Sequence, residues 1–541
     1  MGIPSYYRRL IGSVGGLLYK AKPGTLVANR AKELLMDYNC LIYHVLRDPK
    51  RAQWPSVDQE QDQWLERLYD DIIRYTMRVI RGAGAERVFI AVDGVVPMAK
   101  IRQQRMRRFR SAADAAKRAG AIGPIGQFDT SVANMQALDK AIGPVGQFDT
   151  NAITPGTKFM EGLRIRLEEM IRDERKEKVW VLSSADEPGE GEHKILSKLR
   201  ENSSGEAPYV VYGLDGDLIV LLLWTQQLGI TGTAPIWLYR EDIEGGEVQV
   251  GDGGEEKYVW FSIDRLRDYL RDSEGVHIGD YCATMMLLGN DFLPTSLTFK
   301  IKDGGHNFLL GWLKTALQRG ERFLTEDNTL LMGAWRRLFT QLAAVEERRF
   351  LETIQKKWRA VPRNVEEELP LQIREEKIFL KNGDASADAL KLRENWRDVY
   401  AHTAFYATPG AEFAGVRCAI NAYYTSMAWI VDYYVGRPVS AEWSYSWLLP
   451  PLWGDIAAVT INPVAPPVSP IVLRPQEQLA LVLPAASWYL IPREDPVKNF
   501  ISAAPEFFPT HFEYESIGRR FTWEMEAKIP IPSIQQLRAV I

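Results

Sequence analysis

Acidic side chains follow four short apolar segments, at the point where each segment ends. The segments lack polar alternation and have the length and composition of buried β-strands, with helix-period sequence between them. The four runs are residues 34–36, 88–92, 179–182 and 209–212. The acids that follow them are Asp37, Asp93, Glu190, Glu192, Asp215 and Asp217.

Carboxylates in this pattern favour a metal-assisted reaction on phosphate. In parallel α/β sheets the carboxyl ends of the strands form one ligand-binding edge, so the acids should gather in one cleft. Crowded carboxylates repel one another unless cations neutralise them, and oxygen ligands suit Mg²⁺ or Mn²⁺. Two such ions can clamp a phosphoryl displacement. A single strand-end aspartate is more often a helix N-cap, but four acid-tipped strands favour the metal centre.

A basic segment follows Asp93 within one helix length. Residues 100–118 hold eight basic side chains and one acid. If the segment is helical, Lys100, Gln104, Arg107 and Arg108 share one face, and such a cluster can hold a terminal phosphate. The alternative is a solvated basic helix or a localisation patch. Its place beside a candidate metal ligand favours a phosphate pocket next to the metals.

Glu190 and His193 have the Glu-x-x-His spacing of half a di-iron motif. The spacing alone is a weak signal for such a metal site, and we expect a structural role for His193.

Composition indicates a soluble globular protein of about two to four domains, because 541 residues are 46% hydrophobic and 25% charged. The net charge is −4, so a nucleic-acid site must be a local patch. Three distant cysteines without a Cys-x-x-Cys pair argue against a disulfide framework or a cysteine zinc site. No signal peptide is expected, and the longest apolar run, residues 218–224, is too short to span a bilayer. We expect a cytoplasmic or nuclear protein that is not secreted.

The alternation of apolar runs and helical segments over the first 300 or so residues predicts a parallel α/β sheet that is buried on both faces. One predicted helix carries Phe159, Leu163, Leu167 and Met170 on one face. Residues 121–130 recur almost unchanged at 141–150, which indicates a duplicated loop. Charge-rich residues 366–395 predict a linker or exposed helices, and prolines in 450–492 predict irregular, wrapping chain.

Ten segments of the sequence resemble the XRN family of 5′-to-3′ exoribonucleases, and they span nearly the whole chain. The segments are MGIPSYYRRL, LLMDYN, VFIAVDGVVPMAKIRQQRMRRFRS, NAITPGTKFM, ADEPGEGEHKI, YGLDGDLIVL, LLGNDFLP, YYVGRPVSAEW, RPQEQLALVLPAAS and GRRFTWEMEAKIPIP. The resemblance implies a nuclease core of PIN-like, flap-nuclease-like α/β type. That core would have a mostly parallel sheet flanked by helices, over residues 1–315. A second, helical and loop-rich region, residues 316–541, would wrap around the active site and close its cleft.

The resemblance also implies roles for individual residues. Lys100 would lie near the scissile phosphate as well as in the 5′-monophosphate pocket with Gln104, Arg107 and Arg108. Asp291 joins the metal-binding acids on the resemblance alone, because spacing does not single it out. The acids that match the family's metal site are Asp37, Asp93, Glu190, Glu192, Asp215, Asp217 and Asp291.

Two positions depart from the family pattern. The family's base-stacking His, six residues after the first Asp, is replaced by Tyr43, and His44 follows it. Either ring could stack on the first base. The second aromatic matches Trp443 in an ungapped comparison, with Trp447 as the alternative.

The resemblance thus implies a processive, metal-dependent 5′-to-3′ exoribonuclease that degrades single-stranded RNA with a 5′ monophosphate to mononucleotides. Its cofactor would be two Mg²⁺ ions, with Mn²⁺ as a substitute. A flap-type structure-specific nuclease and a non-catalytic RNA-binding scaffold are the two alternatives. Any protein partners or larger assembly stay open.

Overall fold

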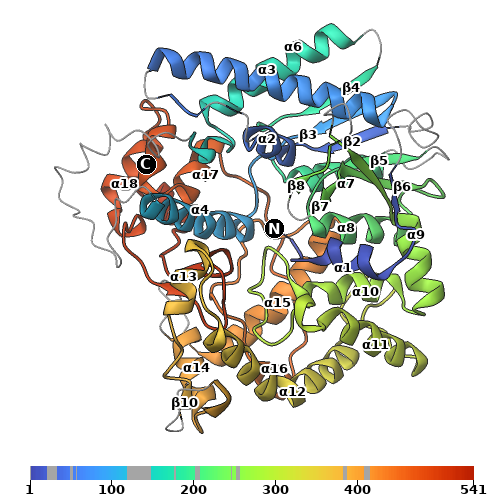
Figure 1. Cartoon of the computed structure of the whole chain (residues 1–541), viewed down its shortest axis with the longest axis vertical. Coiled ribbons are helices and arrows are strands. Elements are labelled where there is room, and N and C mark those ends of the chain that lie inside the picture. The colour runs from blue at the N-terminus through green and yellow to red at the C-terminus, as the bar shows by residue number, and fades with distance from the viewer. Residues whose placement is uncertain are drawn as a thin grey trace.

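The computed structural model describes most of the chain (Figure 1). The first copy of the duplicated segment, residues 121–130, lies outside the described residues, and only 148–150 of the second copy lie within them. The described residues are 2–20, 33–48, 51, 53–55, 58–118, 148–175, 178–201, 208–244, 247–250, 256–381, 387–406 and 415–541.

A seven-stranded sheet organises the N-terminal half. Its order is β1-β9-β6-β5-β2-β3-β4, and the five strands from β6 to β4 are parallel, whereas β9 pairs antiparallel to β6 and to β1. Asp37 pairs with Ala91 and Ala91 with Ser183, so the ends of β2, β3 and β4 are level. The strands are β1 Leu18–Tyr19, β2 Glu33–Asp37, β3 Arg87–Ala91, β4 Val179–Ser183, β5 Tyr209–Tyr212, β6 Ile236–Glu241 and β9 Tyr258–Ser262.

Helices cover both faces of this sheet, as the unalternated strands predicted. Leu34 and Met36 pack on one face against α3 (Asp58–Ala83) and α6 (Lys158–Glu174), which lie above the sheet in Figure 1. Leu35 faces the other side, toward α7 (Gly191–Glu201) and α8 (Gly216–Gln227). Alternate residues of one strand are therefore buried in two different cores.

Helices of the second half extend the core on the α8 side. The same apolar cluster runs from Ile3 through the sheet to Ile517, and it includes α11 across residue 315. The division at residue 315 stays a prediction. The helices of this region are α9 Ile263–Asp268, α10 Ile278–Met285, α11 Gly305–Gln318, α12 Met332–Arg359, α14 Trp396–Phe405, α15 Val416–Tyr434 and α16 Trp453–Ala458.

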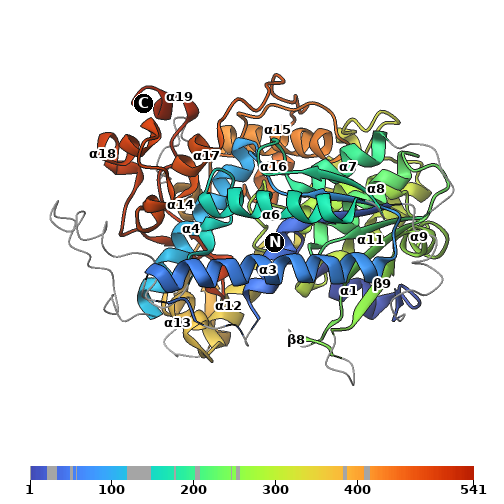
Figure 2. The same ribbon diagram turned by 90° about the horizontal axis from the view of Figure 1, so that it is seen from above.

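Helix α4 (Met98–Arg118) joins the sheet to the C-terminal segments. Ile101 and Phe109 pack in a third apolar cluster with C-terminal residues such as Leu479. Figure 2 shows α4 beside α17. The remaining elements are α1 Tyr6–Ser13, α2 Tyr38–Leu46, α13 Val365–Gln372, α17 Pro475–Val482, α18 Phe500–Ala503, α19 Ile534–Arg538, β7 Ile243–Glu244, β8 Glu247–Val248, β10 Phe379–Lys381, β11 Leu390–Leu392, β12 Tyr514–Glu515 and β13 Glu526–Ala527.

Two expectations for the second half need correction. The charge-rich stretch 366–395 is neither a linker nor only helical, because β10 and β11 pair as an antiparallel hairpin after α13. The proline-rich stretch 450–492 is irregular over 459–474 but also contains α16 and α17. Pro475 occupies the first turn of α17, where a proline is tolerated because its missing N–H would have no helical partner. Within the described residues, no helix is apolar over enough of its length to cross a bilayer.

Candidate active site

The predicted acids lie near the ends of the strands or in the first turns of the helices that follow them. Asp37 is the last residue of β2, and Asp215 precedes the first turn of α8. Both occupy N-cap positions, but neither side chain makes a capping hydrogen bond. The helix-cap alternative is therefore wrong for these two residues.

Gly191 at the start of α7 lets two carboxylates approach each other. Its N–H donates to Oδ1 of Asp93 at 2.7 Å. A Cβ atom at this position would lie 2.7 Å from Oδ1 of Asp37 and 3.3 Å from Oδ1 of Asp93. Any side chain would displace one of these oxygens, so glycine is required where the ends of β2 and β3 meet α7.

The carboxylates form one mutually repelling group, which we call the acidic cluster, with Asp215 at its solvent-exposed side. Burial, followed by the charge of neighbouring acids, raises the pKa of Asp37 and Glu192 well above the ordinary range. Burial and then Asp291 and Asp215 raise the pKa of Asp217 to about 7. Electrostatic interactions link all the members. The acidic cluster comprises Asp37, Asp93, Glu190, Glu192, Asp215, Asp217 and Asp291.

Lys100 brings the α4 helix into the acidic cluster. Its ammonium lies 2.8 Å from Oδ2 of Asp291 and forms a second ion pair with Glu190. Burial alone would lower the pKa of Lys100, but Asp291 and Glu190 outweigh it and raise that pKa well above the ordinary value. Burial likewise opposes ionisation of Asp291, and Lys100 reverses the effect, so the pKa of Asp291 falls below its usual range.

Asp291 reaches the cluster from an irregular loop rather than from a strand end. The loop follows a 3₁₀ turn at residues 286–288. Oδ1 of Asn290 accepts the N–H groups of Phe292 and Leu293, at 2.8 and 2.7 Å, which fixes the turn around Asp291. The Asn-Asp pair after the apolar run was the local signal, but strand periodicity could not reveal it.

Tyr433 of α15 holds Glu190 from the second half of the chain. The Tyr433 hydroxyl donates to Oε1 of Glu190 at 2.7 Å, and the ring of His193 stacks on the Tyr433 ring at 3.6 Å. One possible metal-ligand atom from each of Glu190, Glu192 and His193 lies within 4.8 Å of the other two. Burial lowers the pKa of His193 to about 3 and keeps its ring neutral. Sequence spacing missed Tyr433, because 243 residues separate it from Glu190.

The residues of the predicted phosphate face lie on α4, and phosphate binding by them stays a prediction. Gln104 and Arg108 are each 7% exposed, and Arg107 is half-buried beside them. Nη1 of Arg108 donates to Oγ1 of Thr154 at 2.6 Å, in the loop before α6. Oε1 of Gln104 is buried and has no hydrogen-bond partner among the described residues.

The alternative of a solvated basic helix is wrong for α4. Arg102, Arg105 and Arg110 are turned to protein carbonyl groups. Arg105 is fully buried and donates to the carbonyl oxygens of Leu481 at 2.8 Å and Phe507. These arginines attach the C-terminal segments to α4, while Arg107 and Arg108 remain on the phosphate face.

The aromatic candidates lie in different environments. Nε2 of His44 is 3.1 Å from Oε1 of Glu256, so His44 is engaged in a polar cluster away from α4. Tyr43 is half-buried and interacts electrostatically with Arg108, which places it near the phosphate face. Trp443 is half-buried and donates to Ser426 at 3.1 Å, whereas Trp447 is only 6% exposed. Base stacking by any of them stays a prediction.

Comparison with known proteins adds a family assignment. The model "XRN 5′-3′ exonuclease N-terminus" matches residues 1–231, and the model "Xrn1 helical domain" matches residues 356–540. The 5′-3′ exoribonuclease 2 of Arabidopsis thaliana is 24% identical over 99% of this chain and 66% of its own length. The 5′-3′ exoribonuclease 1 of Homo sapiens is 26% identical over 99% of this chain and 34% of its own length.

The 5′-3′ exoribonuclease 2 of Yarrowia lipolytica is 31% identical over 58% of this chain and 34% of its own length. The chain thus spans between about a third and two thirds of these three relatives. The two models belong to one family and match both halves of a chain whose sheet and helices form a continuous core. The chain therefore belongs to the XRN 5′-3′ exonuclease family.

Proposed function

We propose that this protein is a processive 5′-to-3′ exoribonuclease that degrades single-stranded RNA with a 5′ monophosphate to mononucleotides. One observation carries the proposal. The acidic cluster and the phosphate face of α4 share Lys100, so one buried site holds groups for a terminal phosphate and for its neighbouring phosphodiester. The names of the relatives, all 5′-3′ exoribonucleases, support the same reaction.

The acidic cluster fits a divalent cation of the Mg²⁺ type. Its donors are carboxylate oxygens, and Oδ1 of Asp217 is buried without a partner among the described residues. The raised pKa values of Asp37 and Glu192 mark repulsion that bound cations would relieve. We propose two Mg²⁺ ions, with Mn²⁺ as a substitute, held by the seven acids of the cluster. When bound, such ions activate water and stabilise the leaving oxygen of a phosphodiester.

The chain's own residues would select and orient the RNA end. Arg107, Arg108 and Gln104 would bind the terminal phosphate, with Arg108 held in place by Thr154. Burial of Arg108 strengthens its field and limits the size of the group that fits. A triphosphate or a cap would therefore be rejected.

Lys100 would neutralise charge that develops on the scissile phosphate. Its ammonium is already held between Glu190 and Asp291, so it needs no reorganisation during the reaction. Tyr43 is proposed to stack on the first base rather than His44, because His44 is engaged by Glu256. Trp443 would supply the second stacking surface.

One assay tests the proposal against its alternatives. The chain is incubated with Mg²⁺ and either 5′-labelled monophosphate RNA, the triphosphate form of the same RNA, or a flap DNA. Release of labelled mononucleotide from the first substrate only is expected. Internal cuts in the flap DNA would instead support a structure-specific nuclease. RNA binding without cleavage would support a scaffold.

Two variants connect the assay to the site. Asp215→Ala should abolish turnover while RNA binding is retained. Arg108→Ala should reduce the preference for the monophosphate over the triphosphate by about tenfold, as expected for loss of a charge-assisted contact. An unchanged preference would remove the assignment of the phosphate face.

A further inference from the structure

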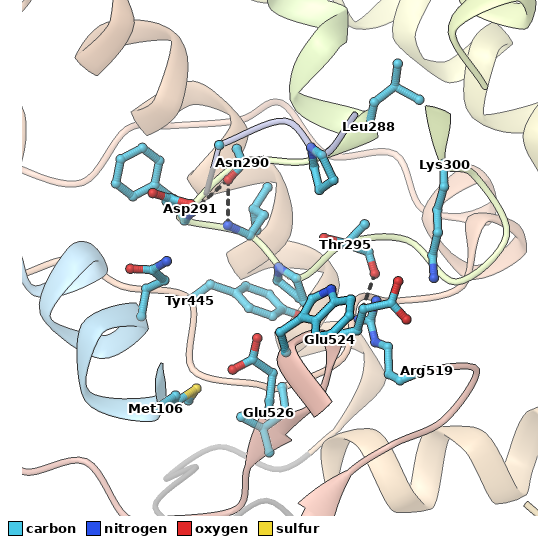
Figure 3. A pocket seen from close by; sticks show the side chains of 18 of the residues that line it. Met106, Leu288, Asn290, Asp291, Thr295, Lys300, Tyr445, Arg519, Glu524 and Glu526 are labelled. Atoms are coloured by element: carbon cyan, nitrogen blue, oxygen red, sulfur yellow. Dashed lines mark hydrogen bonds between the residues drawn. The ribbon is translucent and has the colours of Figure 1, made fainter. Parts of the chain in front are cut away.

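A cavity of about 450 Å³ adjoins Asp291. It is bounded by a different face of α4, which carries Gln103 and Met106 rather than Gln104 and Arg108. The loop after Leu288 and the C-terminal segment 519–526 form its other walls (Figure 3). The cavity therefore shares Asp291 with the acidic cluster but lies apart from the phosphate face.

Two buried cations, Lys300 and Arg519, line one end of this cavity, at 7% and 5% exposure. Figure 3 shows both side chains extending into that end, with Asp291 at the other. Neither cation forms a salt bridge with any described residue, and the Lys300 ammonium makes no hydrogen bond to one. Arg519 donates through Nη2 to the carbonyl of Thr295 at 3.1 Å.

The neighbouring carboxylates compensate these cations only in part. The carboxylate of Glu524 attracts Lys300, but it is already engaged by Lys302 at 2.9 Å and by the N–H of Arg520 at 2.9 Å. The carboxylate of Glu526 attracts Arg519, but it also faces Arg110 and Arg102. Burial, followed by the charge of Arg519, lowers the pKa of Lys300 to about 7, so Glu524 does not offset the burial of this ammonium. Buried cations whose charge is only partly balanced favour an incoming anion at this end of the cavity.

Aromatic side chains form the remaining wall. Tyr445 and Trp447 line the cavity, and Nε1 of Trp447 is buried without a hydrogen-bond partner among the described residues. The rings of Phe521 and Trp523 stack on each other at 4.3 Å at the same cavity. Aromatic faces suit nucleobases, and the volume is within the range of small-ligand pockets, about 300–1,000 Å³.

We propose that this cavity is a second nucleotide site, in which Lys300 and Arg519 bind a nucleotide phosphate and the aromatic wall receives its base. The choice of a nucleotide rests on the proposed function. The anion site rests only on Lys300 and Arg519, neither of which forms a salt bridge with a described residue. The phosphate could belong to a free nucleoside monophosphate, the expected product, or to the RNA strand itself. Both sources present the same chemistry to Lys300 and Arg519.

Calorimetry on the full chain tests the proposal, with AMP as the probe and EDTA present so that no turnover occurs. Because AMP can also enter the phosphate face of α4, the wild type should bind two equivalents. Arg108→Ala should remove one of them, and Lys300→Met should weaken the other by about tenfold or more. Lys356→Met is the matched control, because Lys356 is an exposed lysine paired with Asp303 outside the cavity.

A second arm replaces AMP by a 5′-phosphorylated, phosphorothioate-linked RNA under the same conditions. Weaker binding of AMP by Lys300→Met identifies the free nucleotide as the ligand, and weaker binding of RNA alone identifies the strand. If Lys300→Met binds both probes like the wild type, the proposal is overturned. Binding at Lys300 in a chain that fails to degrade RNA would remove the proposed function and leave the anion site standing.

Thermal unfolding separates this role from a structural one. A buried ammonium that forms no salt bridge or hydrogen bond adds little to the stability of the fold, so Lys300→Met should melt at the same temperature as the wild type or higher. A melting temperature lowered by several degrees, with nucleotide binding retained, would show that Lys300 serves the packing of segment 519–526 and would overturn the proposal.

Discussion

The ammonium of Lys100 lies 2.8 Å from Oδ2 of Asp291, although 191 residues separate the two in the chain. The same ammonium pairs with Glu190, so one lysine of α4 joins a loop after α10 to the start of α7. Lys100 therefore has two roles. Its charge balances part of the acidic cluster, and its contact with Asp291 fixes the position of that side chain.

Lys100→Met should reduce turnover of monophosphate RNA by about 10²- to 10³-fold, because a preorganised cation at the scissile phosphate is lost. Rates at saturating Mg²⁺ measure the effect. Lys314→Met is the control, since this lysine lies on α11 and pairs with Glu274. Turnover within twofold of the wild type would contradict the role of Lys100.

Tyr433→Phe tests whether the second half of the chain positions Glu190. Loss of the 2.7 Å hydrogen bond should raise the Mg²⁺ concentration for half-maximal turnover by about tenfold, as for other partners of metal ligands. Mn²⁺ binding followed by electron paramagnetic resonance gives a readout independent of turnover.

The matched control for Tyr433 is Tyr423→Phe, on the same helix. Tyr423 is buried, and its hydroxyl has no hydrogen bond to a described residue. Equal metal affinities in the two variants would mean that Tyr433 only packs against His193.

The acidic cluster and the phosphate face could be predicted because each follows a local periodicity. Asp37 ends β2 and Asp93 follows the end of β3 by two residues, and these two strand ends are level. Lys100, Gln104 and Arg108 follow helical spacing. Each of these patterns depends on a few neighbouring residues. The folded chain keeps the pattern because the apolar residues of the same strand or helix must be buried in the core.

Asp291 and Tyr433 could not be predicted from spacing, because their partners lie far away in the chain. Asp291 depends on a turn built by Asn290, and Tyr433 reaches Glu190 only when α15 packs beside α7. Burial of Arg105 was equally hidden, since its acceptors are backbone carbonyls more than 370 residues away. Family resemblance supplied Asp291, but neither spacing nor resemblance supplied the other two.

Gly191→Ala tests the convergence of two carboxylates at α7. The added Cβ would lie 2.7 Å from Oδ1 of Asp37, with the carbonyl of Ala91 at 3.0 Å behind it. Metal affinity, measured by Mn²⁺ titration, should fall by about tenfold or more. Gly311→Ala is the control, because nothing lies within 4 Å of its added Cβ in the middle of α11. If both variants bind Mn²⁺ like the wild type, Asp37 and Asp93 need not approach each other.

Arg105→Met tests the attachment of the C-terminal segments to α4. The substitution leaves the carbonyl oxygens of Leu481, Phe507 and Pro530 without their buried donor. Urea unfolding should show a loss of about 3 kcal/mol or more. Arg348→Met, at an exposed residue of α12, should change the free energy of unfolding by less than about 0.5 kcal/mol. If Arg105→Met lowered the free energy of unfolding by no more than Arg348→Met does, the C-terminal segments would be held to α4 by apolar packing alone.

His306 should make stability depend on pH outside the active site. It is 4% exposed, and its Nε2 lies 2.8 Å from the hydroxyl of Tyr281. Burial, followed by the charge of Arg9, lowers its pKa to about 4 from an ordinary value of 6.5. The unfolded chain therefore binds a proton at a higher pH than the folded chain does. The stabilisation is complete above pH 6.5 and is lost as the pH falls toward 4.

His306→Gln removes this titration and keeps a neutral hydrogen-bonding side chain beside Tyr281. Between pH 7.5 and 5, the wild type should lose about 2 kcal/mol more stability than the variant. Urea unfolding of both proteins at each pH measures the difference, and the other titrating groups cancel because both proteins share them. Parallel pH profiles would show that the pKa of His306 is the same in the folded and the unfolded chain, and would contradict the prediction.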